Sequence, residues 1–145
     1  MRKRYGVILA VFGYILFFFY MEGWGEDWRF IGEDVQGTAW EIDVPGISRQ
    51  PNNIVRAWLK KTYSKKGVTD WVKNFGDEYK DFSYLISLEE YHCTEKTYRI
   101  IRLTTYSLGG EAISKEVDPS AKWSFVIPNS MAEAVFKEIC KQPNK

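Results

Sequence analysis

The sequence is poor in the residues that most often carry out chemistry. It has one histidine, His92, and two cysteines, Cys93 and Cys140, among 145 residues. No C-x-x-C spacing is present, so a thioredoxin-type redox centre is not indicated. Gly109-Gly110 lacks the following helix and the spacing of a phosphate-binding loop, and it indicates a tight turn instead. We therefore expect no catalytic residues, no bound cofactor and no metal site, and we expect that the protein is not an enzyme.

The residues around the histidine do not change this expectation. Neighbouring side chains of a strand point to opposite faces, so His92 and Cys93 cannot form an activated thiolate pair there. Alternation places Glu90 and His92 on one face, but two ligands are too few for a zinc site. We interpret Glu89 and Glu90 as part of a solvated strand edge.

The chain also lacks an excess of charge of either sign. Its net charge is +1, and 17 basic and 18 acidic residues remain once residues 1–25, with three basic and one acidic residue, are set aside. A near-neutral domain has no electrostatic footprint for nucleic acid. With 27% charged and 45% hydrophobic residues, the composition is typical of a globular protein.

The N-terminal segment carries the signature of export. Three of the first four residues are basic, and residues 5–21 are uncharged and largely apolar. Gly23 and Gly25 are suitable for a signal peptidase that cleaves after residue 25. The alternative is an uncleaved anchor in the inner membrane, because an uncharged run of this length is at the lower limit for spanning a bilayer. Either way, residues 26–145 form a domain in the periplasm or at the cell surface, with membrane contact only through the N-terminal segment.

The rest of the chain predicts an α+β fold built on one antiparallel sheet. The expected strands are residues 28–31, 38–44, 54–63, 82–93, 97–107 and 111–117. In the third of these, Val55, Ala57 and Leu59 alternate with polar or aromatic residues, the period-2 pattern of a half-buried strand. The strands at 82–93 and 97–107 form a central hairpin.

Two helices are expected beside this sheet. Apolar residues with helical spacing predict a short inserted helix within residues 64–81, ended by Gly76. This helix either offers Trp71 to a partner or packs on the domain's own sheet. Ser130 and Glu133 form a capping box that opens a C-terminal helix, which we expect to pack on the sheet.

The two cysteines are expected to form one disulfide. An even count in an exported chain allows a single intramolecular pairing, and oxidising compartments preserve such bonds. Cys93 ends a strand of the hairpin, and Cys140 falls on the apolar stripe of the C-terminal helix. The alternative is two buried free thiols.

Taken in order, the residues after the export segment resemble the surface-adhesin protein E family. The resemblance is carried by Trp28-x3-Gly32, Gly37-Thr38-x-Trp40-x-Ile42-Asp43, Ile47-Ser48-Arg49, Asn53-x-Val55-x-Ala57-Trp58, Cys93, Tyr98-Arg99, Tyr106, Trp123-x3-Ile127-Pro128-x-Ser130 and Cys140. It implies an antiparallel sheet, a C-terminal helix folded against it and a disulfide joining the two. It also implies binding of host or matrix macromolecules at the cell surface.

We therefore expect a non-enzymatic, exported, adhesin-like envelope or cell-surface protein that binds another protein or a matrix macromolecule. The alternative is an accessory subunit of a periplasmic or inner-membrane assembly, anchored by its N-terminus. Two binding surfaces are candidates: Trp71 on the inserted helix, and the edge strand that carries Lys115 and Glu116. The edge strand also suits pairing with a second copy of the chain, as a homodimer.

Overall fold

A computed structural model describes residues 27–141 of the protein, and the expected signal or anchor segment lies outside these residues. Within them the structure confirms the α+β fold predicted from the sequence. The elements in chain order are β1 (Trp28–Glu33), β2 (Ala39–Asp43), β3 (Ser48–Gln50), β4 (Ile54–Thr62), α2 (Lys65–Phe75), the 3-10 turn η1 (Asp77–Tyr79), β5 (Phe82–His92), β6 (Thr97–Ser107), β7 (Ala112–Val117), β8 (Ser124–Phe125) and α3 (Met131–Cys140).

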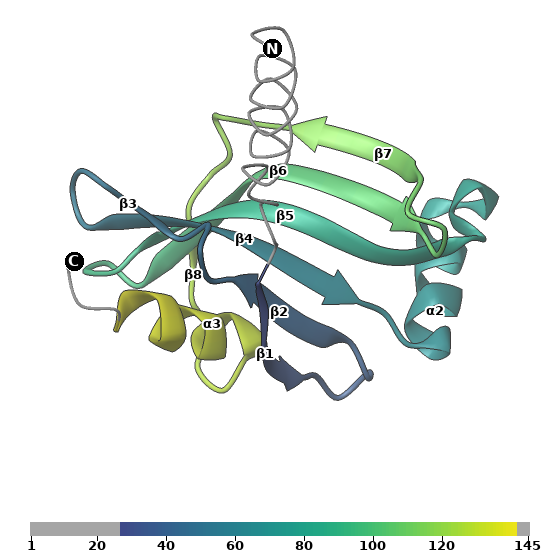
Figure 1. Ribbon diagram of the computed structural model, residues 1–145, viewed down its shortest axis with the longest axis horizontal. Coiled ribbons are helices and arrows are strands. Elements are labelled where there is room, and N and C mark those ends of the chain that lie inside the picture. The colour runs from purple at the N-terminus through teal and green to yellow at the C-terminus, as the bar shows by residue number, and fades with distance from the viewer. Residues whose placement is uncertain (1–26, 142–145) are drawn as a thin grey trace, which may run out of the picture.

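The strands form one antiparallel sheet in which six strands follow the order β1-β2-β4-β5-β6-β7 (Figure 1). The other two are short. β3 pairs with the start of β4, and β8 pairs with the start of β6. The central hairpin of β5 and β6 has the predicted extent to within one residue. The sheet therefore has β1 and β7 at the two ends of its main path.

The alternating burial of strand β4 shows which face of the sheet lies against the core. Val55, Ala57 and Leu59 are at most 1% exposed and define the inner face of the sheet, while their neighbours point to the opposite, outer face. In the register of β4 with β5, Leu59 lies opposite Ser87 and Ala57 lies opposite Glu89. The inner face of β5 is therefore partly polar.

Tyr84, Ile86 and Leu88 of β5 share one face, as alternation requires, and the register with β4 makes it the outer face. Strict alternation would place Phe82 on this face as well, but a register shift separates it from Tyr84 and it is only 3% exposed. Its ring packs among the aromatic residues that contact α2.

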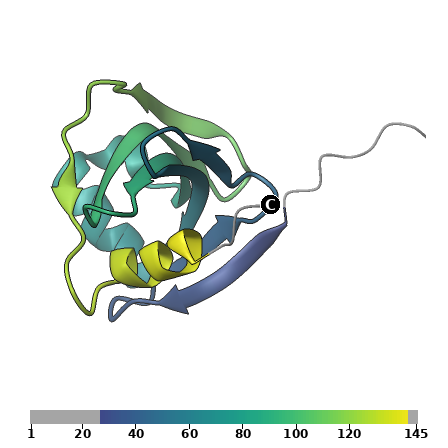
Figure 2. The same cartoon turned by 90° about the vertical axis from the view of Figure 1, so that its left-hand side faces the viewer.

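The two helices lie toward opposite ends of the curved sheet, and α3 runs beside β1 and β2 (Figures 1 and 2). Helix α3 opens with the predicted capping box, in which Ser130 Oγ accepts the amide of Glu133 and the Glu133 carboxylate accepts the amide of Asn129. Val135 and Ile139 of α3 are fully buried in the main core cluster, which draws its other buried members from β2, β4 and β5.

Helix α2 begins at Lys65, within the segment 64–81 where the sequence predicts a helix. Its N-cap is Ser64, whose hydroxyl accepts the amide of Gly67, and Gly76 follows its last residue as predicted. In residues 27–141, neither helix combines the length and the apolar character needed to cross a bilayer.

Candidate functional site

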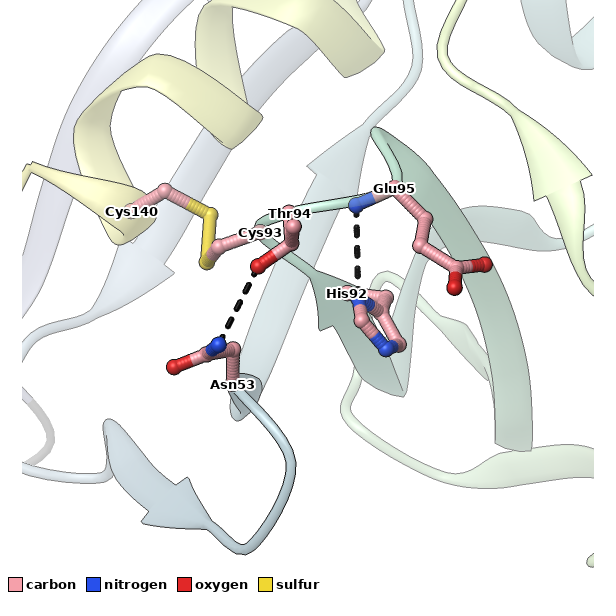
Figure 3. Close-up of a disulfide and its surroundings, with 6 residues drawn as sticks. All are labelled: Asn53, His92, Cys93, Thr94, Glu95 and Cys140. Atoms are coloured by element: carbon pink, nitrogen blue, oxygen red, sulfur yellow. Dashed lines mark hydrogen bonds between the residues drawn. A yellow bond between two sulfur atoms is a disulfide. The ribbon is translucent and has the colours of Figure 1, made fainter.

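The predicted disulfide joins the hairpin to the C-terminal helix (Figure 3). Cys93 lies one residue beyond β5, and its sulfur is bonded to that of Cys140, the last residue of α3. The amide of Cys93 donates to the carbonyl of Asn53, and the Asn53 side chain donates to Thr94 Oγ1. The bridge and these hydrogen bonds fix the β5–β6 turn against α3 and against the loop before β4.

The outer face of the sheet carries aromatic rings paired with cations. The Lys60 ammonium lies 5.5 Å from the ring centre of Tyr84 and 5.7 Å from that of Trp28. The Arg102 guanidinium lies 6.0 Å from the ring centre of Trp58. These distances are within the range of cation–π attraction. The pairs come from β1, β4, β5 and β6, so they form a surface that crosses most of the sheet.

A second part of the same face is organised by Glu90. Its carboxylate accepts hydrogen bonds from Arg56 of β4 and Arg99 of β6, with nitrogen–oxygen distances of 2.6 and 2.7 Å in the two ion pairs. The Arg99 guanidinium also lies 4.6 Å from the ring centre of Trp123, which has an exposed fraction of 37%. We call Trp28, Arg56, Trp58, Lys60, Tyr84, Glu90, Arg99, Arg102 and Trp123 the outer aromatic face.

The ion pairs determine the pKa of Glu90. Burial by itself raises this pKa, but the hydrogen bonds and positive charges of Arg56 and Arg99 outweigh burial and lower it below its usual value. Glu90 therefore stays ionised at neutral pH and holds both guanidinium groups in place. Arg102 differs from these two arginines: no carboxylate within residues 27–141 forms an ion pair with it, and its side chain is exposed.

Glu89 points in the opposite direction, into the core. Its carboxylate accepts hydrogen bonds from Ser87 and Tyr91, both at 2.7 Å, and from the ammonium of Lys61 at 3.1 Å. Glu89 is 1% exposed and Glu90 is 4% exposed. The interpretation of Glu89 and Glu90 as a solvated strand edge is therefore wrong, because β5 is a central strand with paired neighbours on both sides.

The pattern of the sequence contains a signal for the outer aromatic face. Arg56, Trp58 and Lys60 alternate with the buried residues of β4, so large aromatic and basic side chains must share its other face. Sequence reasoning placed them together but did not identify them as a binding surface, because the partners on β5 and β6 depend on the strand register.

Comparison with known proteins identifies the family. The model of the family described as Surface-adhesin protein E matches residues 28–141. The chain belongs to the surface-adhesin protein E family. This confirms the resemblance seen in the sequence, and membership supports an adhesin-like protein of the cell surface.

One solved structure similar to this family member is crystal form II of Haemophilus influenzae protein E. It has 15% sequence identity and a TM-score of 0.47, and the match covers 80% of this chain and 91% of that chain. Comparison with the curated proteins finds no significant match.

In this member of the family, Trp71 packs inside the domain. Its ring centre lies 4.7 Å from that of Phe82 and 5.3 Å from that of Tyr63, and Phe75 and Tyr79 complete the group. The arrangement agrees with the interpretation of α2 as a helix packed on its own sheet. A contribution of Trp71 to partner binding stays a prediction.

Lys115 and Glu116 lie on β7, at one end of the main path of the sheet, and both are exposed. Lys115 pairs with Thr104 of β6, and Glu116 pairs with Leu103. Because successive side chains alternate, only one of the two points to the outer face. Lys115 is that residue, since Thr104 lies opposite Ile86 of the outer face.

Proposed function

We propose that the protein is an exported, non-enzymatic, adhesin-like protein that binds a macromolecule through the outer aromatic face. Binding, rather than a chemical reaction, is its activity in this proposal. The partner is a protein or a matrix macromolecule presented at or near the cell surface. The β7 edge carries Lys115 and Glu116, and Lys115, which points to the outer face, extends the same surface.

The observation that carries this proposal is the composition of the outer aromatic face. Tryptophan, tyrosine and arginine are enriched among the residues that dominate binding energy in protein interfaces. Here Trp58, Tyr84 and Arg102 are gathered on one face of a rigid sheet, and Glu90 fixes the positions of two further arginines. A surface held in place before binding loses little side-chain entropy when a partner docks.

Binding by the outer aromatic face can be tested with purified residues 26–145 on an immobilised extracellular-matrix extract. We expect the double variant Trp58→Ser/Arg102→Ser to bind at least roughly tenfold more weakly than the wild type. Leu108→Ser/Lys80→Ser is a matched control, because it also removes one exposed apolar and one exposed basic residue, but from the turns at the other end of the hairpin. Wild-type binding by a folded outer-face variant would contradict the proposal.

The contribution of the β7 edge has its own test. The amide of Ser114 donates to Thr105 Oγ1 of β6, so the next amide, that of Lys115, points away from β6. Lys115→Pro therefore blocks the addition of a partner strand at this edge while sparing the pairing with β6. Ser114→Pro is the contrasting variant, since it removes a contact inside the sheet. If self-association or partner binding survives Lys115→Pro in a folded protein, the edge is not used.

Trp71→Ala tests the other predicted surface in the same assay. We expect it to act on stability rather than on binding, because the ring is packed among aromatic residues of the domain. Loss of binding by a Trp71→Ala protein that remains folded would show that the binding surface includes α2.

Export is tested by the N-terminus of the protein isolated from the cell envelope. A chain that begins at Glu26 supports a cleaved signal peptide and a released adhesin-like protein. A chain that retains Met1 supports an anchored protein and favours the accessory-subunit alternative. Intact mass spectrometry distinguishes the two chains directly.

A further inference from the structure

A small cavity lies on the inner side of the fold, at the N-terminal end of α3. Its volume is about 280 Å³. Trp40 of β2 and Tyr98 of β6 contribute aromatic rings to its lining, and Ile127 and Met131 contribute apolar side chains. Asp34 is the only charged residue among those that line it. The cavity is therefore an aromatic and apolar pocket with one carboxylate.

The carboxylate of Asp34 is fixed in position by the turn between β1 and β2. Its Oδ1 accepts the amides of Gln36 and Thr38 at 2.9 and 3.0 Å. Its Oδ2 accepts a long hydrogen bond of 3.4 Å from Trp40 Nε1, and the side chain of Thr38 makes a further, weaker interaction with the carboxylate. A carboxylate oxygen accepts two hydrogen bonds. Because the Trp40 contact is long, Oδ2 can accept a shorter hydrogen bond or an ion pair from a ligand.

The charges around the cavity favour a positive ligand. Burial raises the pKa of Asp34, but the amides of Thr38 and Gln36 outweigh burial and lower it, so the carboxylate is ionised at neutral pH. Burial and the charge of Asp34 together raise the pKa of Tyr63 to about 12. The shift at Tyr63 follows from burial and from the negative charge that Asp34 places in this region.

Two positive features nearby are already compensated. The ammonium of Lys61, 4.0 Å from the ring centre of Trp40, is paired with Glu89. The positive end of the α3 helix dipole lies next to Glu133, whose carboxylate occupies the first turn. Neither feature leaves an uncompensated positive charge beside Asp34.

We propose that this cavity binds an organic cation of the alkylammonium class. Aromatic rings attract such cations through their negative faces, and a fixed carboxylate adds direct attraction. The volume is at the small end of ligand pockets, which suits a trimethylammonium or aminoalkyl group rather than a large ligand. The same chemistry has two sources: a free small molecule, or the lysine side chain of another protein.

The cavity is separate from the outer aromatic face. The cavity is lined by β2, the start of β6 and α3 on the inner side, and none of the outer-face residues lines it. Failure of the cation to bind would leave the proposed adhesin-like function untouched, and loss of binding by the outer-face variant would leave the cavity untouched.

The test compares choline with 3,3-dimethylbutan-1-ol, which has nearly the same shape and no charge. Titration calorimetry and amide chemical shifts on residues 26–145 measure both. We expect choline to bind at least roughly tenfold more tightly than the neutral alcohol, with shifts at Trp40 and Met131. Equal affinities, or shifts that lie elsewhere, would overturn the proposal, as would an absence of choline binding at tens of millimolar.

Two variants and one control locate the site. Asp34→Asn keeps the acceptor for the amides of Gln36 and Thr38 but removes the charge, and it should abolish the preference for choline over the alcohol. Glu33→Gln removes an exposed neighbouring charge that does not line the cavity, and it should preserve the preference. Ala132→Leu fills the cavity from the first turn of α3 and should abolish binding of both probes. If Ala132→Leu folds and binds choline normally, the cavity is not the site.

A second comparison separates the two sources. Nα-acetyl-lysine-N-methylamide presents the side chain of a protein lysine, and choline presents a free quaternary ammonium. Tighter binding of the lysine derivative supports a protein side chain as the ligand, and tighter binding of choline supports a small molecule. Both results support the proposal only if Asp34→Asn weakens the binding.

Discussion

The ammonium of Lys61 and the carboxylate of Glu89 lie 3.1 Å apart inside the core, with side-chain exposures of 11% and 1%. Ser87 and Tyr91 donate the remaining hydrogen bonds to the same carboxylate. Burial, the charge of Glu89 and its hydrogen bond raise the pKa of Tyr91 well above its ordinary value. Four residues of β4 and β5 therefore form one polar unit in which each group depends on the others.

This dependence predicts a large loss of stability when the unit is broken on one side. Glu89→Leu should lower the free energy of unfolding by about 3–5 kcal/mol, because it leaves the Lys61 charge buried without a partner. Lys61→Met/Glu89→Leu removes both charges and should recover most of the loss. Urea unfolding at neutral pH measures both variants. An equal loss in the single and the double variant would show that the pair is not the cause.

The disulfide should account for much of the stability of the domain. Cys93 and Cys140 are 47 residues apart, so in the loop-closure model the bond contributes roughly 4 kcal/mol. Cys93→Ala/Cys140→Ala should lose about this amount under oxidising conditions and should be insensitive to dithiothreitol. The wild type should lose the same amount only when the reductant is present. Unfolding curves with and without reductant make the comparison.

The ion pairs of Glu90 predict that the stability of the protein decreases at low pH. The pKa of Glu90 in the folded protein is below its usual value, so its contribution is fully present above about pH 4.5 and is lost as the pH falls through the folded pKa. Glu90→Gln should be less stable than the wild type at pH 7, and the difference should shrink on acidification. Glu116→Gln, a change at an exposed position, should track the wild type throughout. A constant difference for Glu90→Gln from pH 7 to pH 2 would contradict this account.

Trp71 gives a prediction about packing. Its indole N–H is buried and has no hydrogen-bond partner within residues 27–141. Trp71→Phe keeps a ring beside Phe82 and removes the unpaired group, so it should cost less than about 1 kcal/mol. Trp71→Ala removes the centre of the aromatic group and should cost about 3 kcal/mol. Thermal unfolding of the two variants distinguishes them, and equal losses would mean that the ring does not support α2.

Much of the fold could be predicted because local patterns and long-range constraints agree. The alternation of Val55, Ala57 and Leu59 gives the core face of β4, the turn before Thr97 gives the hairpin, and the capping box at Ser130 gives α3. The cysteine pair adds the contact between hairpin and helix that no periodicity contains.

The polar residues of β5 could not be placed in the same way. Tyr84, Ile86 and Leu88 look like a core face, yet they lie on the outer face, and the core receives Ser87 and Glu89. The register with β4 sets the face that each residue of β5 occupies, and Lys61 of β4 donates a hydrogen bond to the inward-facing Glu89. Alternation requires Glu89 and Glu90 to point to opposite faces, but the sequence does not show which of the two carboxylates faces the core. The cavity at Asp34 depends on similar contacts between distant segments.

The bond between Cys93 and Cys140 also has a mechanical consequence. When an attached protein is pulled from its two ends, tension passes through the bridge and does not extend the segment between the cysteines. The 47-residue separation corresponds to roughly 160 Å of extended chain that is withheld while the bond is intact. Strands β6, β7 and β8 and most of α3 lie inside this protected segment. Under load, the segment between Cys93 and Cys140 therefore stays closed while the bond is intact, and the chain that is drawn out lies outside it.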